Sequence, residues 1–374
     1  MWGWQGEIVT GRLIVAKIGS SSLTGADGEI RIDAIERLCA EVATLHNAGN
    51  RVIIVSSGAI AAGLPMLGLG GKRPTDLAVL QAVSAVGQSH LVGHYNRALA
   101  SHGLVGGQVL LAPLDFVHRQ QYLHARQTFR VLLELGVVPV VNENDAIADD
   151  EIRFGDNDRL AALVSHLVQA DLLVLLTDTA GLLTGDPRVD AGASLIEEIV
   201  EVDHQLEAIA GGAGTDRGSG GMASKLAAAK IAAWSGVRAV IASADRPRVL
   251  VDAASGAAGV GTVFVPRPQR LPARKLWIAF AVGSSGTIVV DEGAKVALME
   301  RSVSLLPAGV LRAEGSFDVD DAVELAGPDG RVFAKGISRH GSATVNLLVG
   351  RRTSDLPEDV SHEVVHRDDL VLLP

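Results

Sequence analysis

Residues 137–168 read VVPVVNENDAIADDEIRFGDNDRLAALVSHLV and contain an apolar run, two polar clusters and a helical pattern, in that order. The apolar run, residues 137–141, has the length and composition of a buried strand, and the helical pattern begins near Arg159. A strand followed by a helix is the repeating unit of α/β proteins. The fold class therefore depends on whether this unit recurs along the chain.

The unit recurs several times. Apolar runs rich in Val, Ile and Leu predict strands over residues 13–19, 51–57, 137–142, 171–178 and 237–243. These runs are apolar throughout instead of alternating, which is typical of parallel strands buried on both faces. Helical patterns occupy residues 32–47, 76–101, 119–135, 159–169 and 223–235. We therefore predict an α/β fold in which an open, mostly parallel sheet is sandwiched by helices.

The character of the sequence changes near residue 265. Residues 265–275 contain three prolines and four basic residues, a composition that favours a linker. Beyond them, short apolar runs are broken by Gly, Pro and Asp, as in a small β-rich domain. We predict a large domain over residues 1–266, a linker over 267–275 and a β-rich domain over 276–374.

Charge and cysteine content limit the possible functions. The net charge of −10 over 374 residues makes general binding to nucleic acid or to anionic membranes unfavourable. A small anionic substrate would therefore need a locally cationic pocket. The single cysteine, Cys39, excludes an internal disulfide and fits a reducing cytoplasm; its helical context favours a buried core thiol over a nucleophile. We expect no signal peptide and no membrane-spanning helix.

Polar residues gather at the ends of the predicted strands. These are Lys17, Ser57, the cluster Asn142 to Asp145, and the pair Thr177 and Asp178. In open α/β sheets, ligands bind just beyond the carboxyl ends of the strands. The shared placement predicts that these residues belong to one site.

A glycine-rich turn, RGSGGMASKLAAAKIAAWSG at residues 217–236, precedes a predicted helix. Its glycines allow close approach of the backbone to a ligand, the helix N-terminus directs N–H groups there, and Lys225 adds a positive charge. The turn is not a P-loop, because no Gly-x-x-x-x-Gly-Lys-Ser/Thr occurs in the chain. A phosphate-binding turn and an ordinary mobile glycine loop both remain open at this point.

Lys17 interrupts an otherwise apolar strand. A lysine is seldom buried without a partner, because desolvation of its ammonium group is costly. The alternative is that the side chain extends along the strand and reaches the surface. If Lys17 and Lys225 instead converge from two segments, they suit a transferred phosphoryl group, whose developing charge is stabilised electrostatically.

The clusters NEND and GDND could also hold a metal, act as a catalytic acid/base pair, or form solvated turns. The ligand spacing of a calcium loop fails at Ala146 and at Leu160. We expect no zinc site either, because we expect the eleven histidines to be scattered, with no pair at ligand spacing on a helix. An acid/base pair remains possible, but it leaves the lysines and the glycine turn unexplained. No protein metal site is predicted.

Taken together, the motifs resemble the amino acid kinase family. They are VAKIGSSSLTG, VIIVSSGAIAAG, QAVSAVGQ, VVPVVNENDAI, FGDNDRLAALV, LLVLLTDTAGLLTGDPR and GSGGMASKLAAAKIA, in the order found in the family. The segment beyond about residue 275 resembles a PUA domain. Within the family, the combination is most similar to the branch that phosphorylates the side-chain carboxylate of L-glutamate with ATP. That reaction is the first step towards proline.

The resemblance implies roles for individual residues. Lys17, Lys225 and Asp158 are the expected catalytic residues, with Lys17 on the ATP phosphates and Asp158 holding the two lysines. Ser57, Asp145 and Asn157 would bind glutamate, with Asp145 on its α-ammonium group. Asp156 could share the task of Asp158, whereas Glu143, Asp149, Asp150 and Glu151 are expected to be solvated turn residues. The nucleotide would be bound by Lys17, Thr177, Asp178, Ser219, Gly220, Gly221, Met222, Ala223, Ser224 and Lys225.

The resemblance also implies Mg²⁺, feedback inhibition by proline and a homo-oligomer. Two alternatives stay open: a kinase of the same fold that acts on another carboxylate or phosphate acceptor, and an RNA-binding regulatory protein. Residues 275–374 contain 15 Asp and Glu against 10 Lys and Arg, a net charge of −5, which disfavours general RNA affinity.

Overall fold

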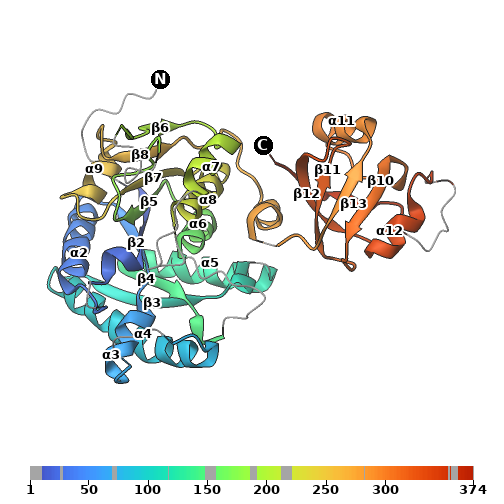
Figure 1. The fold of residues 1–374 in the computed structure, drawn as a ribbon. Helices are drawn as coiled ribbons and strands as arrows, with labels where there is room; N and C mark the ends of the chain where they lie inside the picture. Colours follow the sequence, from blue (N-terminus) through green and yellow to red (C-terminus); the bar gives the residue numbers. More distant parts are fainter. Residues whose placement is uncertain are drawn as a thin grey trace. The chain divides into compact units, whose positions relative to one another are not determined.

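The chain forms two compact units, residues Met1–Arg270 and Leu271–Pro374, each of which is described by itself (Figure 1). The computed structural model describes all residues except 1–10, 26–27, 70–73, 117, 148–156, 186–191, 212–220, 282, 353, 355–360 and 374. The division after Arg270 lies inside the predicted linker. The exact limits of the linker, 267–275, remain a prediction.

The first unit is built on an eight-stranded sheet in the order β3-β4-β2-β1-β5-β7-β8-β6. All neighbouring pairs are parallel except β7 and β8, which are antiparallel. The strands are β1 (Leu13–Ile18), β2 (Arg51–Ser56), β3 (Val105–Leu111), β4 (Val137–Glu143), β5 (Leu172–Thr177), β6 (Glu198–Ile199), β7 (Arg238–Ser243) and β8 (Gly261–Phe264). The mostly parallel α/β fold is confirmed, and so are the five predicted strands.

Three strands were not predicted. The strand β3 lies at one edge of the sheet, contains Gly106 and Gly107, and exposes part of its surface, so it lacks the continuous apolar run of an interior strand. The other two, β6 and β8, lie together at the opposite edge and are only two and four residues long. Short strands at a sheet edge leave little periodic signal in the sequence.

The helices of the first unit form two layers. The five predicted helices are present as α2 (Ile32–Asn47), α4 (Leu77–Ala100), α5 (Arg119–Glu134), α6 (Asn157–Leu167) and α8 (Met222–Trp234). The structure adds α1 (Ser20–Leu23), α3 (Ala59–Met66), α7 (His204–Gly211), α9 (Val249–Ser255) and the 3₁₀ turns η1 (Pro113–Phe116) and η2 (Asp145–Ile147). Apolar side chains of α2, α4 and α9 share one core with the sheet. The helices α6 and α8 pack on each other and on β5, away from α2 and α9 (Figure 1).

Close contact between α3 and α4 depends on two glycines. A Cβ atom at Gly87 would lie 1.9 Å from the carbonyl oxygen of Ala59, and one at Gly63 would lie 2.1 Å from that of Val83. Neither position has room for a side chain, so the two helix backbones can touch. This contact helps to hold α4 beside the end of β4, where Ser84 and Gln88 make hydrogen bonds. At the start of α4, the side chain of Asp76 accepts a hydrogen bond from the N–H of Val79 and caps the first turn.

The second unit is β-rich, as predicted. Its five-stranded sheet has the order β10-β9-β11-β12-β13, formed by β9 (Gly286–Val290), β10 (Val310–Gly315), β11 (Ala322–Ala326), β12 (Val332–Ser338) and β13 (Val365–Leu372). The helices α10 (Ala273–Leu276), α11 (Glu292–Arg301) and α12 (Ser342–Leu348), the π-helical turn η3 (Trp277–Ala281) and the 3₁₀ turn η4 (Pro307–Gly309) complete it. The buried carboxylate of Asp369 in β13 pairs with Arg274 of α10 and with Arg339.

Candidate active site

Polar side chains converge at the carboxyl ends of β1, β2, β4 and β5. Lys17 is the second-last residue of β1 and is paired in register with Val55 and Leu175 on either side. Ser57 directly follows β2, and Thr177 ends β5. Because these strands are parallel, their carboxyl ends lie along one edge of the sheet. The register therefore brings together residues that are far apart in the sequence.

The centre of this edge is a buried group of three charges. Lys17 of β1 and Lys225 of α8 both form ion pairs with Asp158 of α6, and the distance from Lys225 Nζ to Asp158 Oδ2 is 3.1 Å. Their exposed fractions are 3%, 5% and 0%. The hydroxyl of Ser224 donates a further hydrogen bond of 2.8 Å to Asp158 Oδ2. The alternative for Lys17, in which its ammonium group reaches the surface, is therefore wrong.

The electrostatics of this group follow from its contacts. Burial favours the neutral form of Asp158, but the charges of Lys17 and Lys225, with the hydrogen bonds from Lys17 and Ser224, outweigh it and lower the pKa of that carboxyl. Asp158 is therefore ionised at neutral pH. Two ammonium groups against one carboxylate leave a formal charge of +1 in a buried position, and such a charge suits an anionic ligand.

The residues expected to hold glutamate occupy two connected places. Asn157 Nδ2 donates to Ser57 Oγ at 3.1 Å, and Asn157 Oδ1 accepts from the N–H of Glu143 at 3.3 Å. Asp145 begins η2, two residues after the end of β4, and accepts a 2.6 Å hydrogen bond from Ser84 of α4. The structure thus joins Asn157 to Ser57 directly and holds Asp145 from the side of α4.

Two contact residues on α4 were missed in the sequence. Ser84 holds Asp145, and one helical turn later Gln88 Oε1 accepts a 2.7 Å hydrogen bond from Asn142 Nδ2. The orientation of both amides follows from the network, since Asn142 Oδ1 accepts from the N–H of Glu143 and Asn142 must therefore offer Nδ2 to Gln88. Among the described residues, the buried Nε2 of Gln88 has no hydrogen-bond partner. The signal in the sequence that could have identified these two residues is a serine and a glutamine four residues apart among the buried positions of one helix.

One prediction for the acidic residues is wrong. Glu143 is not a solvated turn residue: it ends β4 and is only 6% exposed. Its burial follows from the extension of β4 by one residue, which pairs Glu143 with Leu111 of β3. Asp149, Asp150, Glu151 and Asp156 lie outside the described residues.

The expected nucleotide-binding residues flank the charged group. Thr177 is buried at the end of β5, pairs in register with Ser243, and donates a 3.0 Å hydrogen bond to Asp178. Gly221 is the N-cap of α8, which begins at Met222, one residue before the predicted start. Met222, Ala223 and Ser224 form the first turn of α8, whose N–H groups point out of the helix end. Ser219 and Gly220 lie outside the described residues.

The described residues contain no group of three or more His, Cys, Asp or Glu side chains that could hold a metal ion. Both oxygens of Asp158 are engaged by Lys17, Lys225 and Ser224, which leaves this carboxylate unsuited to Mg²⁺. We therefore assign no described residue to Mg²⁺. The prediction about histidine spacing is wrong at one place, because His90 and His94 are four residues apart on α4.

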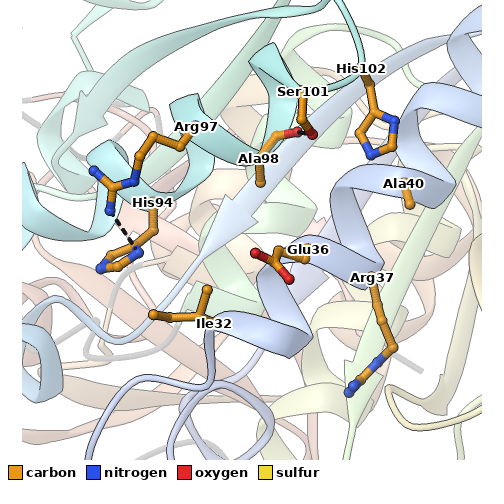
Figure 2. A pocket seen from close by; sticks show the side chains of 9 residues that line it. All are labelled: Ile32, Glu36, Arg37, Ala40, His94, Arg97, Ala98, Ser101 and His102. Carbon is orange, nitrogen blue, oxygen red and sulfur yellow. Dashed lines mark hydrogen bonds between the residues drawn. The ribbon is translucent and has the colours of Figure 1, made fainter.

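A surface hollow of about 540 Å³ lies between α2 and α4 (Figure 2). Its lining includes Glu36 and Arg37 of α2, His94 and Arg97 of α4, and His102. None of the predicted site residues lines it. Cys39, another residue of α2, is buried. Burial raises the pKa of its thiol to about 12, which fits a core thiol and not a nucleophile.

Comparison with known proteins adds independent evidence. The profile described as "Amino acid kinase family" matches residues 12–243, which include every described residue of the proposed site. The chain belongs to the amino acid kinase family. A second profile, the PUA domain, matches residues 286–358 in the β-rich unit. In the described part of this amino acid kinase, no helix is long and apolar enough to cross a membrane.

Relatives of this amino acid kinase extend over nearly the whole chain. A protein of Nocardia farcinica named glutamate 5-kinase is 45% identical over 97% of this chain and 98% of its own. A protein of the same name from Caldanaerobacter subterraneus subsp. tengcongensis is 44% identical over 96% of this chain and 97% of its own. Another, from Frankia casuarinae, is 47% identical over 98% of each chain.

Proposed function

We propose that this protein transfers the terminal phosphoryl group of ATP to the side-chain carboxylate of L-glutamate, giving glutamyl 5-phosphate and ADP. The observation that carries the proposal is the buried group formed by Lys17, Asp158 and Lys225 at the carboxyl ends of the strands. The similarity to proteins named glutamate 5-kinase over nearly their full length supports the choice of substrates.

The main difficulty of the reaction is electrostatic. A glutamate side chain has a pKa of about 4.3, so its carboxylate is already ionised at neutral pH and needs no general base. One carboxylate oxygen attacks the terminal phosphorus while the bond from that phosphorus to the bridging oxygen of ADP breaks. Two anions must approach each other, and Lys17 and Lys225 offset their repulsion and stabilise the charge in the transition state.

The acidic residues then have structural tasks. Asp158 touches both lysines, so it holds their ammonium groups at fixed positions. Asp145 pairs with the α-ammonium group of glutamate, and Ser57 with Asn157 binds the remaining polar groups of the amino acid. Thr177, Asp178, the glycine turn with Ser219 and Gly220, and the start of α8 bind the nucleotide. Mg²⁺, carried by the ATP phosphates, supplies further charge neutralisation when it is bound.

The wider properties of the enzyme are proposed from the resemblance alone. They are a place at the first step towards proline, feedback inhibition by proline, a homo-oligomeric state and a cytoplasmic location. An acyl phosphate is prone to hydrolysis, so the class of reaction that consumes the product must act on it promptly.

The decisive assay mixes the full-length protein with ATP, Mg²⁺ and L-glutamate and traps the acyl phosphate with hydroxylamine. We expect a hydroxamate that depends on both ATP and glutamate. ADP release should be measured in parallel with aspartate, acetylglutamate, carbamate and UMP. Activity with one of these acceptors and none with glutamate would replace the proposed substrate but keep the phosphotransferase.

A further inference from the structure

The helix α4 carries a pair of histidines that the proposed reaction does not use. His90 and His94 are four residues apart, so their side chains lie one above the other on one face of the helix. Their Nε2 atoms are 3.3 Å apart, and the ring centroids are 4.7 Å apart with the ring planes nearly perpendicular. His90 is exposed and His94 is half-buried. The contacts to Asp145 and Asn142 are made by other residues of the helix, Ser84 and Gln88.

We propose that His90 and His94 form a two-ligand binding site for a divalent transition-metal ion of the class of Zn²⁺, Ni²⁺ or Cu²⁺. Imidazole nitrogen is a preferred ligand of these ions. Two nitrogens at roughly 2.0–2.1 Å from a tetrahedral Zn²⁺ lie about 3.4 Å from each other. The observed separation of 3.3 Å is close to that value, so the two rings need little movement to share one ion.

Arg97 determines how the two rings are protonated without a metal. Its Nη2 lies 2.9 Å from Nδ1 of His94. Because a guanidinium group has only donors, Nδ1 must accept, and the ring proton of a neutral His94 then resides on Nε2. This N–H donates to Nε2 of His90. Burial, with the charge of Arg97, lowers the pKa of His94, which fits a neutral ring at neutral pH.

Metal binding through Nε2 requires the other tautomer of His94. The proton moves from Nε2 to Nδ1, and no net proton is released. The new Nδ1–H then faces the guanidinium donor of Arg97, so this hydrogen bond is lost, and the cation also repels the metal. Arg97 therefore competes with the metal, and its removal is expected to strengthen binding.

The surroundings of the pair set the kind of site. His94 and Arg97 line the hollow between α2 and α4, where Figure 2 shows the contact between them. Among the described residues, no third His, Cys, Asp or Glu completes a metal-binding group. We therefore expect water to fill the other coordination positions, and an affinity below that of closed structural zinc sites.

The test uses full-length protein. Calorimetric titration with Zn²⁺ gives the affinity, and electron paramagnetic resonance with one equivalent of Cu²⁺ gives the number of nitrogen ligands. We expect His90→Gln and His94→Gln each to weaken Zn²⁺ binding by about tenfold or more and to remove one nitrogen from the Cu²⁺ spectrum. His102→Gln is the matched control, because His102 lines the same hollow without belonging to the pair.

A third variant tests the geometry. In Arg97→Gln, the amide oxygen can accept from Nδ1–H of His94 and the competing cation is gone, so Zn²⁺ should bind several-fold more tightly. Unchanged Zn²⁺ affinity in both histidine variants would overturn the proposal, and so would weaker binding in Arg97→Gln. Hydroxamate formation in the two histidine variants is expected to equal that of the unmodified protein. The metal site and the proposed reaction can therefore fail separately.

Discussion

At the scale of single residues, Asp158 has the most contacts that bear on the proposed reaction. It is fully buried and is the shared partner of Lys17 and Lys225. Asp158→Asn would leave two buried ammonium groups without their counter-charge, which typically costs about 3–5 kcal/mol of stability. We expect the melting temperature to fall and kcat for hydroxamate formation to decrease by about 100-fold or more.

The control for Asp158→Asn lies in the same region. Lys230 of α8 pairs with Glu207 at 2.8 Å; Lys230 is half-buried and Glu207 is exposed. A pair with one exposed partner contributes about 0–1 kcal/mol, and neither residue belongs to the proposed site, so Lys230→Gln should leave kcat unchanged. Equal losses of activity in the two variants would contradict the role assigned to Asp158.

Asp145 is predicted to recognise the α-ammonium group of glutamate. Asp145→Asn removes the charge and keeps the shape, so the KM for glutamate should rise by roughly tenfold or more while the KM for ATP changes little. Ser84→Ala removes the hydroxyl that donates to Asp145 and should raise the same KM by a smaller factor. Steady-state kinetics with each substrate varied in turn checks both. Parallel increases in both KM values would count against a glutamate-specific role.

His166 links stability to pH. Burial, with the charge of Arg270, lowers the pKa of His166 to about 4, against about 6.5 in an unfolded chain. Between these pH values the unfolded state binds more protons, so stability increases with pH and is lost as the pH falls from 6.5 to 4. The total effect is on the order of 3 kcal/mol. Urea unfolding of His166→Gln should show a flatter pH dependence over this interval; an unchanged slope would refute the assignment.

The residues of the site differed in how well they could be predicted. Lys17 was identifiable because a charge inside an apolar strand requires a partner. Ser84 and Gln88 were not, because their role depends on the position of α4 over β4, which is a tertiary property. The burial of Glu143 was missed for a similar reason, since it depends on pairing with the edge strand β3.

At the scale of the elements, the contact between α3 and α4 can be tested at two glycines of one helix. A Cβ atom at Gly87 would overlap the backbone of α3, whereas one at Gly93 would meet only the side chain of Arg97 at 3.5 Å. Gly87→Ala should therefore destabilise the protein by several kcal/mol and raise the KM for glutamate, because α4 carries Ser84. Gly93→Ala should stabilise by about 0.5–1 kcal/mol.

Chemical denaturation of both glycine variants measures these changes. Similar stabilities for Gly87→Ala and the unmodified protein would show that the two helices can separate at little cost. The comparison is internal to one helix, so differences in helix propensity cancel.

Elements with a strong periodic pattern were predicted well. The bounds of α2 were predicted to the residue, because its apolar face carries a clear 3.6-residue signal. Those of α4 and α8 were predicted within one residue, although the apolar periodicity of these two helices is weak. The short helices α3 and α9 and the short strands β6 and β8 carried too few residues for such a signal. Tertiary packing, not local propensity, determines whether such short segments form.

At the scale of the whole molecule, each unit has its own apolar core. In the second unit, Asp369 is a buried carboxylate held by two arginines, and Asp369→Asn is expected to destabilise that unit alone. Hydrogen exchange should show lost protection in β13 and α10, with β1 and β5 unchanged. Equal loss of protection in β1 would show that the two cores unfold together.

The three charges of the proposed active site also have a consequence for folding. Lys17 and Asp158 are separated by 141 residues in the sequence, and Asp158 and Lys225 by 67. Burial of any one of these charges is unfavourable until its ion-pair partners are in place. Their meeting requires closure of two long loops, which is entropically costly and slow. Enzymatic activity would therefore return late during refolding, after the helices have formed, and would report completion of the first unit more faithfully than a spectroscopic measure of helix content.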